Sequence, residues 1–139
     1  MSLFNFFAAD KPLSELTIGI EDHGSYIIIE DEFRTLNIYT EQYEGCPEEF
    51  TKLPHIMGVE FGRFNRMKDE LLGYVLAAAD QCTQMELWSI WLDDPDRNIE
   101  HRACRREDLT EEDLAWIWGQ EYFTHPRCLK VYKWRRGAK

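Results

Sequence analysis

The run QMELWSIWLDD at 84–94 constrains the fold of this chain more than any other stretch. Its apolar residues fill both alternating sets of positions, whereas a strand with one solvent face keeps polar residues in one set. One set contains Met85, Leu87 and Trp91, and the other contains Trp88, Ile90 and Leu92. A strand that is apolar on both sides has to be covered on both faces of its sheet. The run therefore predicts a central strand, closed by the loop DDPDRN at 93–98.

The first third of the chain predicts three more strands. Residues 14–32 are typical of a hairpin, because Ile18 alternates with polar neighbours and EDHG offers a turn in which Gly24 adopts a positive φ. The β-branched run YIIIE at 26–30 predicts a strand that is buried on both faces. Residues 33–43 alternate again, so the three segments together predict an antiparallel meander.

The strongest helical pattern covers 59–82. Apolar residues recur there at spacings of three and four, at Phe64, Met67, Leu71, Val75 and Ala78. Gly73 and Ala77 form a small flat patch that lets another element approach closely. In the segment before this helix, Pro47 is suited to open a single helical turn and Pro54 to end it.

A second, shorter helix is predicted at 109–120. Thr110 is a suitable N-cap, and Asp113 stands where a capping box has its acid. Leu109 and Leu114 have the spacing of a hydrophobic staple, and Gly119 suits the position after the last turn. Trp116 and Trp118 are two apart, so we expect one in the core and the other at a helix–sheet contact or a surface.

Strands are also predicted on both sides of this helix. Residues 99–105 read as the return strand paired with 84–94, and 128–134 as the last strand. The opening LFNFF at 3–7 reads as a short apolar segment packed onto the core. We therefore expect an α+β fold in one domain, residues 1–139, with one largely antiparallel sheet of five to six strands and two to three helices on one face.

Charge restricts the choice of partner. The chain has 16 basic and 26 acidic residues, a net charge of −10, and its acidic residues end at Glu121. Six basic residues lie in the last thirteen positions, which leaves residues 1–126 at −16. Such a surface repels phosphates and attracts cations, so we expect a basic protein partner and no direct nucleic acid binding.

Cysteine usage and hydropathy suggest a compartment. The chain has four cysteines, no recognisable signal peptide and no apolar run long enough to span a membrane. We expect a cytoplasmic protein with reduced thiols and no membrane partner.

Two His-x2-Cys pairs, His101 with Cys104 and His125 with Cys128, resemble half-sites for zinc. If 99–105 is a strand, however, His101 and Cys104 point to opposite faces, so we expect no metal and two small buried cysteines on neighbouring strands. The sequence has no phosphate-binding glycine loop, no Gly-x-Ser-x-Gly and no His-Glu-x-x-His. We therefore assign no catalytic residue and no cofactor, and expect that the chain is not an enzyme.

Acidic clusters beside aromatic residues are the most usable functional signal. Carboxylates on loops of a rigid sheet can select a basic partner while nearby aromatic side chains supply the affinity. The candidate partner-binding residues are Glu30, Asp31, Glu32, Tyr39, Glu41, Tyr43, Glu44, Glu48, Glu49, Trp91, Asp93, Asp94 and Asp96.

In general character the chain resembles the immunity proteins of bacterial contact-dependent-inhibition and polymorphic-toxin systems. The resemblance is carried by the opening MSLFNFF, the strand MELWSIWLDD, the helix LTEEDLAWIWGQ and the acidity of the whole. It implies a stoichiometric inhibitor that covers the active site of a toxin domain, often a nuclease with a basic cleft. Two alternatives stay open: a small-molecule-binding or enzymatic α+β domain, and a structural or regulatory module that forms a weak homodimer.

Overall fold

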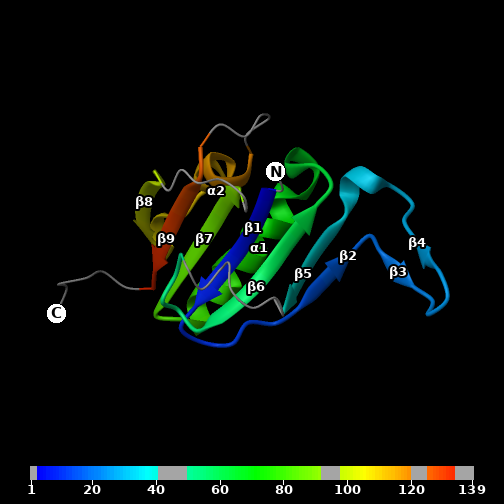
Figure 1. Cartoon of the computed structure of the whole chain (residues 1–139), viewed down its shortest axis with the longest axis horizontal. Helices are drawn as coiled ribbons and strands as arrows, with labels where there is room; N and C mark the ends of the chain where they lie inside the picture. Colours follow the sequence, from blue (N-terminus) through cyan, green and yellow to red (C-terminus); the bar gives the residue numbers. More distant parts are fainter. Residues whose placement is uncertain (1–2, 41–49, 92–97, 120–124, 134–139) are drawn as a thin grey trace.

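A seven-stranded sheet organises the part of the chain that the computed structural model describes, residues 3–40, 50–91, 98–119 and 125–133 (Figure 1). The strand order is β2-β5-β6-β1-β7-β9-β8, and all neighbours are antiparallel except β8 and β9. The strands are β1 (Leu3–Ala9), β2 (Leu16–Ile18), β5 (Leu36–Thr40), β6 (His55–Phe61), β7 (Gln84–Trp91), β8 (Glu100–Arg105) and β9 (Arg127–Tyr132). The predicted α+β class with a largely antiparallel sheet is confirmed. The strand count exceeds the predicted five to six because β1 and β6 were not foreseen.

Strand β1 lies at the centre of the sheet, between β6 and β7. The prediction that this apolar segment packs in the core is confirmed, but its place as a central strand was not predicted. Phe6 and Phe7 are both fully buried, although consecutive strand residues point to opposite faces. A strand with a large apolar residue on each side is stable only where both faces are covered, which is the central position.

Helix α1 (Phe64–Gln81) begins later than predicted, because residues 55–61 form strand β6. Val59 pairs with Ile38 on one side and Asn5 on the other, so tertiary pairing overrides the helical reading of this segment. Within α1 the predicted core side is confirmed: Met67, Leu71, Val75 and Ala78 are buried. The helical turn suggested for Pro47 lies outside the described residues, as does most of the loop 93–98.

The patch at Gly73 and Ala77 receives no neighbouring element in the described part of the chain. Both residues are exposed, and a Cβ added at Gly73 would meet no atom within 4 Å. The prediction of a close approach at this place was wrong.

Both α-helices of the described ranges, α1 and α2 (Glu111–Trp118), cover the same face of the sheet (Figure 1). Phe7, Leu87 and Leu129 face them and share one apolar cluster with Leu71 and Leu114. A smaller cluster lies on the opposite face: it contains Phe6, Ala8, Trp88, Ile90 and Cys128, with Phe50, Leu53, Ile56 and Ile99 packed on it. The prediction that β7 is a central strand with two apolar faces is confirmed, since its neighbours are β1 and β9.

Helix α2 begins as predicted. The Asp113 carboxylate accepts the backbone N–H of Thr110 at 2.9 Å, and Leu114 of the expected staple is fully buried. Trp118 is buried and donates its Nε1–H to the carbonyl of Trp88 at 3.2 Å. Trp116 makes the helix–sheet contact, because the guanidinium of Arg102 on β8 stacks on its ring.

Two predicted strand pairings were wrong. Residues 100–105 do form a strand, but β8 pairs parallel with β9 and is not paired with β7 as its return strand. The meander of 14–43 is also absent, because β2 pairs directly with β5. The chain between them leaves the sheet and forms a separate two-stranded hairpin, β3 (Glu21–Asp22) with β4 (Ile27–Ile28), followed by the 3₁₀ turn η1 (Glu32–Arg34).

Candidate functional site

The segment 19–34, which we call the hairpin arm, lies beyond β2 at one edge of the sheet (Figure 1). Its tip is a tight turn stabilised locally: the Asp22 carboxylate accepts the N–H of Gly24 at 2.8 Å, and His23 N–H bonds to the Tyr26 carbonyl at 2.9 Å. Gly24 has φ of 83°, as its place in the predicted turn requires. The imidazole of His23 stacks on the Tyr26 ring at 4.9 Å. The tip of the hairpin is therefore stabilised by contacts within the hairpin itself.

The root of the arm is held by backbone contacts and by α1. Arg63 N–H bonds to the Phe33 carbonyl at 3.0 Å, and its guanidinium lies 4.7 Å from the centre of the Phe33 ring. Arg66 pairs with Asp31 at 3.2 Å, and the other oxygen of Asp31 caps η1 by accepting Phe33 N–H. These contacts fix the position of the arm relative to the start of α1.

The apolar side chains of the arm are exposed. In the described ranges five large apolar side chains are exposed, with fractions between 38% and 61%, and all five belong to the arm. They are Tyr26, Ile27, Ile28, Ile29 and Phe33. The expectation of a strand buried on both faces at 26–30 was therefore wrong, because β4 has β3 as its sheet neighbour and no layer covers it among the described residues. Several exposed large apolar side chains gathered on one short segment are typical of an interaction site on a folded protein.

Carboxylates surround this patch. Between Glu21 and Arg34 the chain has five acidic residues and one arginine. Asp22 stabilises the turn and Asp31 stabilises the root of the arm. The Glu21 carboxylate lies 3.3 Å from Nε2 of His23. Glu30 and Glu32 are exposed, and neither has a salt bridge within the described ranges. The arm therefore combines apolar surface with uncompensated negative charge.

A cleft of about 430 Å³ lies at the root of the arm. It is lined by Ile18, Gly19, Ile20, Glu21, Ile28, Glu30, Asp31 and Arg34. Gly19 has φ of 76°, and a Cβ there would collide with the carbonyl oxygen of Arg34. Glycine at this position lets the chain turn out of the sheet while it stays close to η1.

The predicted partner-binding residues divide into three groups. Glu30, Asp31 and Glu32 lie on the arm. Tyr39 on β5 and Trp91 on β7 are separated by two intervening strands, and the register places Tyr39 on the face of Phe6 and Trp91 on the face of Phe7, so the structure does not bring them together. The remaining eight lie outside the described residues: Glu41, Tyr43, Glu44, Glu48, Glu49, Asp93, Asp94 and Asp96.

The apolar residues of the arm were not among the sequence candidates. The run YIIIE reads as core because β-branched residues are usually buried. A usable signal was its setting: Glu21 and Asp22 precede it and Glu30, Asp31 and Glu32 follow, which is unusual for a strand covered on both faces.

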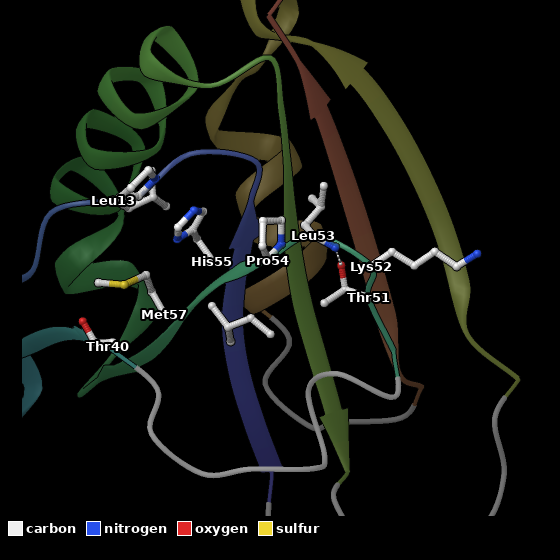
Figure 2. A pocket seen from close by; sticks show the side chains of 10 residues that line it. Leu13, Thr40, Thr51, Lys52, Leu53, Pro54, His55 and Met57 are labelled. Atoms are coloured by element: carbon white, nitrogen blue, oxygen red, sulfur yellow. Dashed lines mark hydrogen bonds between the residues drawn. The ribbon is translucent and has the colours of Figure 1, made fainter.

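A second cleft, of about 560 Å³, lies near the start of β6 (Figure 2). Figure 2 shows His55 and Met57 on one side of it, while the Lys52 side chain extends away. The Thr51 hydroxyl donates to the buried carboxylate of Glu86 at 2.5 Å, and Glu86 also accepts Trp88 Nε1–H at 3.0 Å. The Thr51 side chain therefore anchors its segment to strand β7 through Glu86.

The two His-x2-Cys pairs do not form a metal centre in the described ranges, where no group of three potential ligands comes together. His101 is in register with Cys128, whereas Cys104 packs against the helix-face core, so His101 and Cys104 lie on opposite faces as predicted. Burial raises the pKa of the Cys104 thiol to about 11, and nearby Asp113 adds to the shift. Burial also raises the pKa of Cys128, with Glu86 contributing. Both behave as small apolar residues.

No helix in the described ranges is long and apolar enough to cross a membrane. No protein-family model, curated protein sequence or solved structure matches this chain. The functional argument therefore depends on the hairpin arm itself.

Proposed function

We propose that this chain is a non-catalytic binding protein that docks a basic protein partner through the hairpin arm. One observation carries the proposal: every exposed large apolar side chain of the described ranges lies on one acidic hairpin. Complete burial of one such side chain stabilises by about 1.5–3 kcal/mol. A partner that covers several of them gains affinity from the apolar surface, and the surrounding carboxylates select a basic partner.

In its specific form, we propose a cytoplasmic bacterial immunity protein that neutralises a toxin domain. The general resemblance to that class supports this role, as do the net charge of −10 and the acidic arm. A nuclease active site presents cations that hold phosphates, and carboxylates such as Glu30 and Glu32 are suited to occupy those positions. The acidic residues at 41–49 and 93–96 remain part of the proposed surface.

The test uses as the partner probe the toxin-type C-terminal domain that this proposal expects the gene immediately upstream to encode. We expect a 1:1 complex with a nanomolar or lower Kd by calorimetry. Replacing Ile27 and Ile29 together by Ala removes exposed apolar surface, so we expect at least a tenfold weaker complex and a denaturation midpoint close to that of the wild type. A complex unaffected by this double variant contradicts docking through the arm.

Charge is tested by a matched pair of reversals. Glu30→Lys changes the arm, whereas Glu112→Lys makes the same change at an exposed position on α2. We expect the association rate at low salt to fall roughly three- to tenfold for Glu30→Lys, with a much smaller change for Glu112→Lys. Equal effects would mean that overall net charge, and not the arm, guides association.

A homodimer is the other role that an exposed apolar hairpin suits. Two arms meeting in a symmetric contact would bring together two sets of five carboxylates, which is unfavourable. Sedimentation velocity between low and high micromolar concentration separates the two roles: we expect a monomer throughout. A dimer that the Ile27 and Ile29 double variant dissolves would replace the proposed function.

A further inference from the structure

We infer that the cleft at the root of the hairpin arm binds one arginine side chain of the partner. The inference rests on the proposed function, which assigns a basic protein to the arm, and it names the side chain that enters this cleft. Its basis is the chemistry of the lining, together with two arginine contacts that the arm already makes within this chain.

The cleft combines two kinds of wall. Ile18, Ile20 and Ile28 provide apolar surface, and Glu21, Glu30 and Asp31 provide carboxylates. Glu21 pairs with Ile28 across the hairpin, so the carboxylate and the apolar side chain lie on the same face. The volume of about 430 Å³ leaves room for a long side chain and several waters, each of which takes about 30 Å³.

This combination fits a long cationic side chain better than a neutral one. An apolar group entering the cleft would remove water from the carboxylates without giving them a partner, which is costly. An arginine places its methylene groups along the isoleucines while its guanidinium faces the carboxylates, and its planar fork can bind two oxygens at once.

The arm already contacts two arginines at the start of α1. Arg63 lies over the Phe33 ring at 4.7 Å, and Arg66 pairs with Asp31 at 3.2 Å. These contacts place arginine against an apolar ring and a carboxylate of the arm. Asp31 also lines the cleft, but its two oxygens already bind Arg66 and the Phe33 N–H. Glu21 pairs with His23, and Glu30 has no salt bridge in the described part of the chain, so Glu30 is the cleft carboxylate best placed for a further cation. The cleft thus offers, beside Glu30, the same kinds of apolar and carboxylate group that already bind Arg63 and Arg66.

Arg34 and Glu30 should have opposite effects on arginine binding. It also lines the cleft, and no salt bridge in the described ranges involves it. Its charge repels an incoming guanidinium, whereas the charge of Glu30 attracts it. Removing the charge of Arg34 should therefore strengthen arginine binding, and removing the charge of Glu30 should weaken it.

The experiment titrates the ¹⁵N-labelled full chain with the blocked peptide acetyl-Gly-Arg-Gly-amide, followed by NMR. We expect saturable shifts at Gly19, Ile20, Ile28 and Glu30 with a millimolar Kd. The isosteric citrulline peptide, which lacks the charge, should bind at least fivefold more weakly. Glu30→Gln should weaken arginine binding about threefold, Arg34→Gln should strengthen it about threefold, and Glu112→Gln should leave it unchanged.

Two results overturn the inference: no saturable shift at the cleft, or equal shifts with the citrulline peptide. The proposed function fails separately, when the Ile27 and Ile29 double variant binds the upstream-encoded domain as tightly as the wild type. An arm that docks the domain while the cleft ignores the arginine peptide leaves the function standing and removes only the cleft assignment.

Discussion

At the scale of single residues, a glycine allows the hairpin arm to lie close to the end of β6. Gly62 follows β6, where its N–H bonds to the Thr35 carbonyl at 3.1 Å. A Cβ at this position would collide with the carbonyl oxygen of Glu32. Gly73 is the opposite case, since it is exposed in the middle of α1 with open space around it.

These two glycines form a matched pair of variants. We expect Gly62→Ala to lower the free energy of unfolding by about 1–3 kcal/mol, because the backbone at Glu32 and Phe33 would have to move away from the added methyl group. We expect Gly73→Ala to raise it by about 0.5–1 kcal/mol, because alanine restricts the unfolded chain and favours the helix. Urea denaturation followed by circular dichroism measures both. A loss of stability in Gly73→Ala would show that the close-packed patch expected there exists after all.

At the scale of elements, α2 was the part best predicted from the sequence, because its signals are local. A cap, an acid three residues later and a flanking leucine pair act within one turn of helix, so they do not depend on the rest of the fold. Strand pairing is non-local: nothing within LFNFF shows that it lies between β6 and β7, and nothing in 99–105 shows a parallel neighbour.

The arm shows the same limit for the candidate site. The acids Glu30, Asp31 and Glu32 could be chosen from the sequence, since clustered charge is visible there. The exposure of Ile27 and Ile29 was missed, because a β-branched run by itself predicts a strand without showing whether another layer covers it, and only the flanking acids pointed to exposure. Exposure depends on where the sheet ends, and here it ends at β2, one residue before Gly19.

The cap of α2 supports a prediction at this scale. Asp113→Ala removes the acceptor for Thr110 N–H and one negative charge at the helix start, so we expect about 1 kcal/mol of destabilisation. Glu112→Ala, its exposed neighbour in the same first turn, should cost only a few tenths. Equal losses in urea denaturation would show that the charge, and not the cap, stabilises the helix.

At the scale of the whole molecule, partly buried groups make stability depend on alkaline pH. Burial raises the pKa of Tyr74 to about 12 from its usual 10, and Cys82 nearby adds to the shift. The Tyr74 hydroxyl donates to the carbonyl of Ser14 at 2.6 Å, so the neutral form is also the bonded one. The pKa of Cys104 is raised to about 11 from 9, mainly by burial. The folded state thus favours the protonated form of each group.

The sign of the effect follows from linkage. A group whose folded pKa lies above its unfolded pKa contributes stability that is complete below the unfolded value and is lost as pH rises through the folded value. For Tyr74 this window runs from about pH 10 to 12. Tyr74→Phe loses the hydrogen bond to Ser14, so we expect it to be about 1 kcal/mol less stable than the wild type at pH 7. Because phenylalanine does not ionise, the difference should shrink between pH 10 and 12, and urea midpoints across that range measure it. Curves that stay parallel up to pH 12 would show that Tyr74 ionises in the folded protein as readily as in the unfolded chain.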